Sequence, residues 1–130
     1  MRVAVASQDY QHVSGHAGQA RRWLLFEAGE RGEPVCLGQV ELSKEQVFHH
    51  WDDSGPHPLD GICAVFAASA GDSFQNRMRK RGIEPVMTGA RLAQDAVREW
   101  MAAQVTPPRP RPVGQVLCKL RDLFSDHRER

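Results

Sequence analysis

One apolar run decides the fold: Ile62-Cys63-Ala64-Val65-Phe66-Ala67-Ala68. A strand with no polar alternation is typical of a parallel sheet that is covered on both of its faces. After this run, the sequence pattern predicts a helix at 74–81, a strand at 83–88 and a second helix at 91–103. This order predicts a parallel βαβ unit that ends in a helix. We expect the strand at 83–88 to lie at a sheet edge, since Pro85 has no backbone N–H group to donate.

The first third of the chain carries shorter apolar runs that predict three strands joined by turns and loops. These runs are 3–6, 23–26 and 35–42. Ser43 is a good N-cap and Gln46 stands three positions after it, which predicts a short helix over 43–51. Both halves together predict an α/β domain with a mixed five-stranded sheet, built as a β-meander followed by βαβα, with helices on both faces.

Length and composition indicate one globular domain with an ordinary core. The chain has 130 residues, of which 41% are hydrophobic and 25% are charged. Its net charge of +1 is too small to indicate a nucleic acid or an anionic membrane as a partner. The three cysteines are widely spaced, which argues against a disulfide framework, and no run approaches the roughly 20 apolar residues of a membrane span. Without a signal-like segment at its N-terminus, the chain is expected to be cytoplasmic.

The last part of the chain differs in composition from the rest. Residues 1–104 carry 11 basic and 13 acidic side chains, a net charge of −2, whereas residues 105–130 carry six and three, a net charge of +3. The stretch 106–112 contains four prolines and predicts a stiff linker. Apolar residues at helical spacing over 113–124, flanked by basic ones, predict a short amphipathic helix that docks on its own domain or on a partner protein. We therefore expect a domain at 1–104, followed by a linker and a basic helix at 105–130.

A loop between the first two predicted strands, at 12–20, offers the clearest candidate ligands. It contains His12 and His16, and histidine nitrogens are good ligands for iron and other transition metals. Gly15 and Gly18 favour a loop over a helix, so the four-residue spacing of the two histidines does not by itself define a site.

Motifs for catalysis are missing from the sequence. We find no GxSxG, HExxH or CxxC motif and no glycine-rich phosphate-binding motif. A turn at 69–73 lies between the buried strand and a helix, where backbone N–H groups could receive an anion. We therefore expect a binding protein and not an enzyme.

Seven segments follow one another in a recognisable order and spacing. They are 2–7, 13–20, 23–27, 57–61, 70–74, 81–88 and 93–100. With these segments the chain, over about residues 1–103, resembles the dinitrogenase iron–molybdenum cofactor family, the group of NifX, NafY and the C-terminal domain of NifB. The resemblance implies a ribonuclease H-like fold with three α/β/α layers. It also implies a non-catalytic role: a carrier holds an iron–sulfur precursor or the finished iron–molybdenum cofactor and passes it on during nitrogenase maturation.

The same resemblance implies a binding site in the loop after the first strand. In the family a histidine of this loop is the suspected cofactor ligand, and His16 is the matching position. The family usually has His-Phe-Gly here, so we expect Ala17 to remove an aromatic wall from the site. The residues expected to shape the site around a large anionic cluster are Ser14, Gly15, Arg21 and Gly71. His12 and His57 are the candidates for additional metal ligands.

Three functions follow from these observations. The first is the cofactor carrier, with nitrogenase or nitrogenase-assembly proteins as its partners. The second is a nucleic-acid enzyme of ribonuclease H type, which needs several carboxylates around two metal ions, whereas the first strand at 2–7 offers none. The third is a ligand-free interaction module of the same fold that recruits a partner through residues 105–130.

Overall fold

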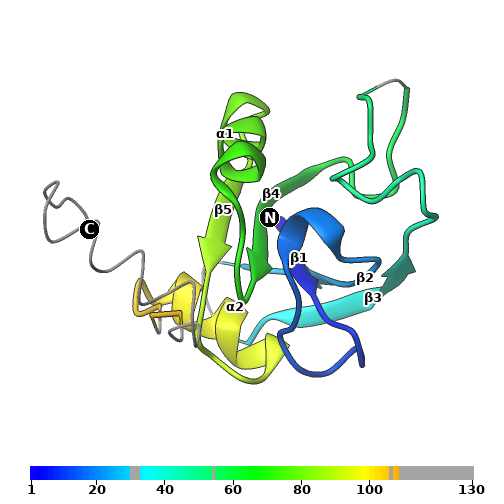
Figure 1. Cartoon of the computed structure of the whole chain (residues 1–130). Helices are drawn as coiled ribbons and strands as arrows, with labels where there is room; N and C mark the ends of the chain where they lie inside the picture. Colours follow the sequence, from blue (N-terminus) through cyan, green and yellow to red (C-terminus); the bar gives the residue numbers. More distant parts are fainter. Residues whose placement is uncertain (30–32, 54, 106, 109–130) are drawn as a thin grey trace, which may run out of the picture.

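The computed structural model describes residues 1–29, 33–53, 55–105 and 107–108, and it shows an α/β fold (Figure 1). The elements follow the predicted order of a β-meander and then βαβα. In chain order they are β1 (Arg2–Ala6), the short 3₁₀ turn η1 (Ala17–Gln19), β2 (Arg22–Glu27), β3 (Val35–Glu41), β4 (Ile62–Ala67), α1 (Asp72–Lys80), β5 (Glu84–Met87) and α2 (Ala93–Met101). The amphipathic helix that the sequence predicts over 113–124 lies outside the described residues.

The five strands form one mixed sheet in the order β3-β2-β1-β4-β5. β4 pairs in parallel with both β1 and β5, while β2 pairs antiparallel with both β1 and β3. Only β2 therefore runs against the other strands. The apolar strand β4 lies inside the sheet and β5, with its Pro85, forms one edge, so both predictions are confirmed.

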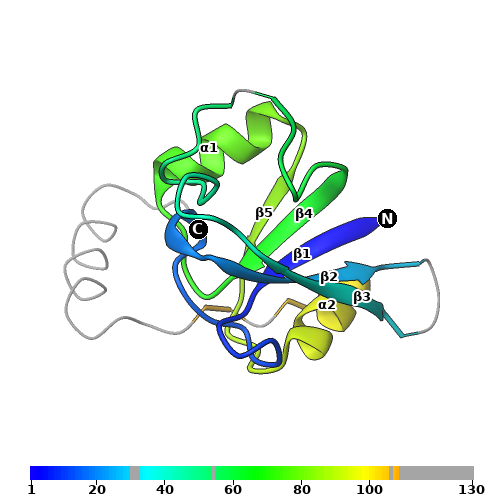
Figure 2. The same cartoon turned by 90° about the vertical axis from the view of Figure 1, so that its right-hand side faces the viewer.

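Helices cover both faces of the sheet, which gives the fold three layers (Figure 2). α1 presents Phe74 and Met78, four positions apart, to one face. The cover of this face is completed by Leu42, Val47, Phe48 and Leu59. α2 packs on the other face through three buried residues of one helical side. These are Ala93, Ala96 and Val97. No helix in the described part of the chain is long and apolar enough to cross a membrane.

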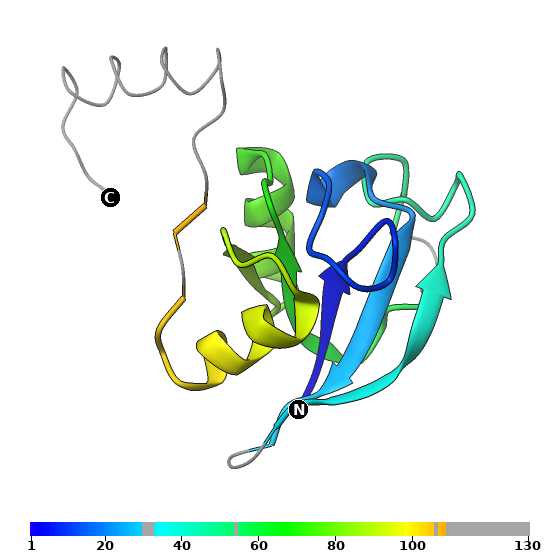
Figure 3. The same cartoon turned by 90° about the horizontal axis from the view of Figure 1, so that it is seen from below.

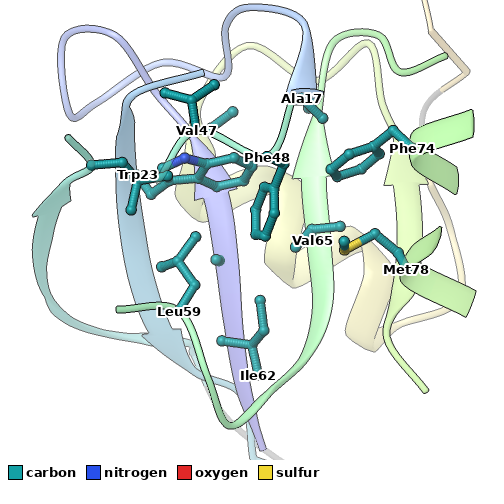
Figure 4. Close-up of a cluster of buried hydrophobic side chains, with 13 residues drawn as sticks. Ala17, Trp23, Val47, Phe48, Leu59, Ile62, Val65, Phe74 and Met78 are labelled. Atoms are coloured by element: carbon teal, nitrogen blue, oxygen red, sulfur yellow. The ribbon is translucent and has the colours of Figure 1, made fainter. Parts of the chain in front are cut away.

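Aromatic rings fill the core beneath α1 (Figure 4). Phe48 lies between Trp23 and Phe74, edge to face with each, and the ring centroids are 5.9 Å and 5.6 Å apart. Trp23 is fully buried, and its Nε1 donates to the carbonyl oxygen of Ala20 over 3.1 Å. Ala17 packs in the same cluster. Two residues of the loop between β1 and β2 are therefore fixed to the core: Ala17 by packing and Ala20 by the hydrogen bond from Trp23.

The predicted helix over 43–51 is wrong, because this segment forms separate turns. One half of the expected capping box is present, since the backbone N–H of Ser43 donates to Oε1 of Gln46 over 3.0 Å. A continued helix would pair the Gln46 carbonyl with the N–H of His50. That carbonyl accepts instead from Nε2 of His57, at 2.7 Å. A side chain from outside the segment thus takes the place of the next helical hydrogen bond.

The exposed edge strand β3 pairs irregularly with β2. Leu25 pairs with Gly38 and Phe26 with Cys36, so Leu37 has no partner residue on β2. This is the arrangement of a β-bulge, in which one extra residue locally disrupts the ladder and bends the strand.

Candidate functional site

Three segments meet at the end of the sheet where the parallel strands β1 and β4 finish. They are the loop after β1, the turn between β4 and α1, and the segment after β3 (Figure 3). Backbone hydrogen bonds join them: Ala17 donates to the Ser69 carbonyl over 2.9 Å, and His49 donates to the Gly18 carbonyl over 2.6 Å. Ligands of α/β proteins bind beyond the carboxyl ends of strands, which makes this end the candidate site.

His16 lies at the centre of this junction. Its Nδ1 is 3.1 Å from Oγ of Ser69, and the backbones of the two residues form a parallel bridge. A Cβ atom added to Gly71, the N-cap of α1, would lie 3.9 Å from Nε2 of His16. The ring is half-buried and lines two cavities. The His16 ring therefore lies next to the start of α1 and borders both cavities.

The larger cavity has a volume of about 420 Å³ and is lined mainly by residues with polar or charged side chains. Its lining residues are Gln8, Ser14, Gly15, His16, Gln19, Ala20, Arg21, Arg22 and Glu41. Oε2 of Glu41 lies 3.7 Å from Nη2 of Arg21 and 3.8 Å from Nε of Arg22. Two guanidinium groups against one carboxylate leave an excess of positive charge, which suits an anionic ligand.

The smaller cavity, of about 160 Å³, combines aromatic and basic groups. It is lined by His16, Gly18, Phe48, His49, Gly71, Ser73, Phe74 and Arg77. None of these described lining residues is acidic. The cavity thus offers two imidazoles, a guanidinium group and the N-terminal end of α1, which carries partial positive charge.

The structure brings together five residues that the sequence predicts as one site. Ser14, Gly15, His16 and Arg21 line the larger cavity, and Gly71 lines the smaller one beside His16. Gly15 has a φ of +74°, a left-handed conformation that glycine adopts without steric cost. This turn of the backbone comes directly before His16.

His12 and His57 lie elsewhere, and neither lines the two cavities. The His12 ring pairs with Asp9, with Nδ1 2.7 Å from Oδ2. His57 is buried, and both of its ring nitrogens form hydrogen bonds: Nε2 donates to the Gln46 carbonyl and Nδ1 accepts from the N–H of Leu59 over 3.1 Å. Among the described residues, no group of three or more histidine, cysteine or acidic side chains is placed to hold a metal ion.

Asp9 braces the start of the loop that carries His16. Its Oδ1 accepts from the backbone N–H groups of Gln11, at 2.9 Å, and His12, at 2.8 Å. The hydrogen bonds from His12 hold the pKa of the Asp9 carboxyl well below its ordinary value of 3.8. The ring of His12 therefore serves to fix this loop.

The sequence points to the turn at 69–73 only for its backbone N–H groups, and it does not indicate the side chains of Ser69 and Arg77, although both organise the site. Ser69 contacts the ring of His16 from 53 positions along the chain. Arg77, on α1, donates through Nη1 to the Phe48 carbonyl over 2.6 Å and through Nη2 to the Trp51 carbonyl. A serine before a helix and an arginine on a helix surface are too common to indicate such roles.

Ala17 is buried and lines neither cavity. Its side chain packs in the core cluster that also contains Phe48 and Phe74. These two phenylalanines line the smaller cavity, so aromatic surface is present there beside the alanine at position 17.

Comparisons with known proteins bear on the family and the fold of the chain. The family model described as dinitrogenase iron-molybdenum cofactor matches residues 1–103. Protein NifX of Rhodobacter capsulatus is 30% identical over 116 residues, which cover 83% of this chain and 73% of NifX. The crystal structure of PH0822 shares the fold with a TM-score of 0.56 at 21% identity, covering 82% of this chain and 94% of that chain. An NMR structure of a candidate NifB protein from Thermotoga has a TM-score of 0.52 at 17% identity, with coverages of 81% and 90%.

Proposed function

Since the chain belongs to the dinitrogenase iron–molybdenum cofactor family, we propose that it binds the iron–molybdenum cofactor, or an iron–sulfur precursor of it, as a transient cargo. It delivers this cargo to nitrogenase or to nitrogenase-assembly proteins. Members of the family bind or carry the cofactor and are not enzymes. The observation that carries the proposal is the position of His16, whose ring lines both cavities at the end of the sheet.

The chemistry of the site suits a large anionic cluster that contains iron. An imidazole nitrogen is a good ligand for iron, and the hydroxyl of Ser69 at Nδ1 orients the His16 ring. We assign Nε2, the nitrogen on the Gly71 side, as the ligand atom. Arg21 and Arg22 attract the negative charge of the cluster, while Ser14 and Gly15 shape the same cavity. Attachment through few protein ligands favours release, which a carrier requires.

The cargo-binding domain in this proposal is residues 1–104, which the family match to 1–103 supports. Residues 105–130, the linker and the basic helix predicted from sequence, lie outside that match. The ribonuclease H-like class is supported by the strand order, with β2 alone running against the other strands. His12 and His57 are not part of the proposed site, because neither lines the two cavities. Both ring nitrogens of His57 also form hydrogen bonds.

Anaerobic incubation with isolated iron–molybdenum cofactor, followed by gel filtration and iron analysis, tests the proposal. We expect the wild-type chain to retain iron and His16→Ala to bind at least about tenfold more weakly, since the variant lacks the ligand nitrogen. His50→Ala is the matched control, because His50 is an exposed histidine that lines neither cavity. Equal retention by wild type and His16→Ala, or no retention by either, contradicts the proposal.

Ser69→Ala is expected to weaken cargo retention by about tenfold, an effect typical of losing a group that orients a metal-ligating histidine. The contact between Oγ and Nδ1 of His16 is the one that the variant removes. Ser69→Thr keeps a hydroxyl on Cβ and should restore most of the affinity. The same iron analysis provides the measurement, and wild-type retention by Ser69→Ala would show that the hydroxyl does not position the ring.

A further inference from the structure

The smaller cavity holds a second imidazole besides that of His16. His49 comes from the segment after β3, whereas His16 comes from the loop after β1. The sequence cannot separate His49 from its neighbour His50, since both are histidines on one short segment. In the structure the two rings meet edge to face, with centroids 5.0 Å apart, and His50 lines neither of the two cavities.

Three hydrogen bonds fix the backbone around His49. Its own N–H donates to the Gly18 carbonyl over 2.6 Å, which ties it to the loop that carries His16. Arg77 donates to the carbonyls of the residue before His49, Phe48, and of the second residue after it, Trp51. Phe48 itself is only 2% exposed. The exposed His49 side chain therefore starts from a backbone that is held on both sides.

We propose that His49 supplies a second imidazole ligand to the cargo, so that the smaller cavity belongs to the binding site. This inference rests on the proposed function. Imidazole nitrogens from two separate loops can coordinate iron at two points of one cluster. Arg77 and Arg81 share one carboxylate, Asp53, which leaves an excess of positive charge beside the cavity. No acidic residue is among the described residues that line the cavity. The exposure of His49 also leaves this ligand accessible to a receiving protein.

The test compares His49→Ala and His49→Gln with His50→Ala in the full chain, with isolated iron–molybdenum cofactor as the probe under anaerobic conditions. Gel filtration and iron analysis measure affinity and release. Both His49 variants should lower the affinity at least about tenfold, whereas His50→Ala should match wild type. Pulsed electron paramagnetic resonance of the bound cofactor gives a second readout, because the coupling to histidine nitrogen should decrease in His49→Ala.

The outcomes separate this inference from the proposed function. If His16→Ala loses the cofactor while His49→Ala binds like wild type, the role of His49 is overturned and the carrier function stands. If the wild-type chain does not bind, both are overturned. If His50→Ala costs as much as His49→Ala, or the nitrogen coupling is unchanged in His49→Ala, His49 is not a ligand. Melting temperatures close to wild type are expected for the His49 and His50 variants, since both side chains are exposed.

Discussion

Trp23→Ala is expected to lower the free energy of unfolding by about 3–5 kcal/mol, the usual cost of removing a large buried aromatic side chain. Trp23 is fully buried and is among the largest buried side chains of the core. Its loss leaves a cavity beside Phe48, which the ring now contacts edge to face. Urea denaturation followed by circular dichroism measures the change. A loss below about 1 kcal/mol would mean that the core closes over the gap.

Two conservative variants separate the ring from its N–H group. Trp23→Phe keeps an aromatic ring but loses the hydrogen bond to the Ala20 carbonyl, which should cost about 1 kcal/mol beyond the smaller ring. Trp51→Phe is the matched control, because Nε1 of Trp51 is buried without an acceptor among the described residues. Its hydrogen-bond cost should be close to zero. Since Ala20 lines the larger cavity, Trp23→Phe should also weaken cargo binding more than Trp51→Phe does.

Arg77→Met should lower the free energy of unfolding by about 3 kcal/mol, because hydrogen bonds from charged groups contribute about 1.5–3 kcal/mol each. The variant leaves the carbonyls of Phe48 and Trp51 without their guanidinium donor. Methionine preserves most of the apolar stem, so the loss reports on the hydrogen bonds. Urea denaturation gives the free energy, and hydrogen exchange should become faster between residues 48 and 51.

Arg81→Met is the control for Arg77→Met. Arg81 also lies 2.9 Å from Asp53 but belongs to an exposed ion pair, so its removal should cost less than about 0.5 kcal/mol.

The hydrogen bond from Arg77 holds the pKa of Asp53 below its ordinary value of 3.8. The ionised carboxyl therefore favours the folded state above that pH, and this contribution is lost as the pH falls through the lowered pKa. By NMR titration, the pKa of Asp53 should rise toward 3.8 in Arg77→Met. Equal losses of stability in Arg77→Met and Arg81→Met would show that the contacts of Arg77 with the Phe48 and Trp51 carbonyls do not stabilise the fold.

Much of the fold could be predicted because burial leaves a local pattern in the sequence. The run at 62–68 has no polar alternation, and β4 is buried between two neighbouring strands. Pro85 correctly predicts an edge, since a missing N–H group is a property of one residue. The prediction of a helix over 43–51 is wrong because a contact from outside the segment decides its structure. Its cap signal is real, but the His57 side chain, 11 positions from Gln46, takes the carbonyl that a helix needs.

The candidate site divides in the same way between local and distant contacts. Ser14, Gly15 and Arg21 lie within a few positions of His16, so one loop brings them to one cavity. Ser69 approaches His16 only because β1 lies beside β4. The periodicity of apolar residues predicts the strands but not which strands are neighbours. Residue type alone also cannot distinguish a histidine that binds a ligand from one that stabilises the fold. His57, for example, uses both ring nitrogens to support the turns around it.

The two edges of the sheet bear on how copies of the protein behave toward one another. Regular edge strands offer unpaired backbone groups on which further chains can add and grow into aggregates. Here β5 carries Pro85, which cannot donate a ladder hydrogen bond, and β3 carries the unpaired Leu37, where the strand departs from regular spacing. Both irregularities disfavour strand addition. We therefore expect both edges of the sheet to resist fibril-like growth.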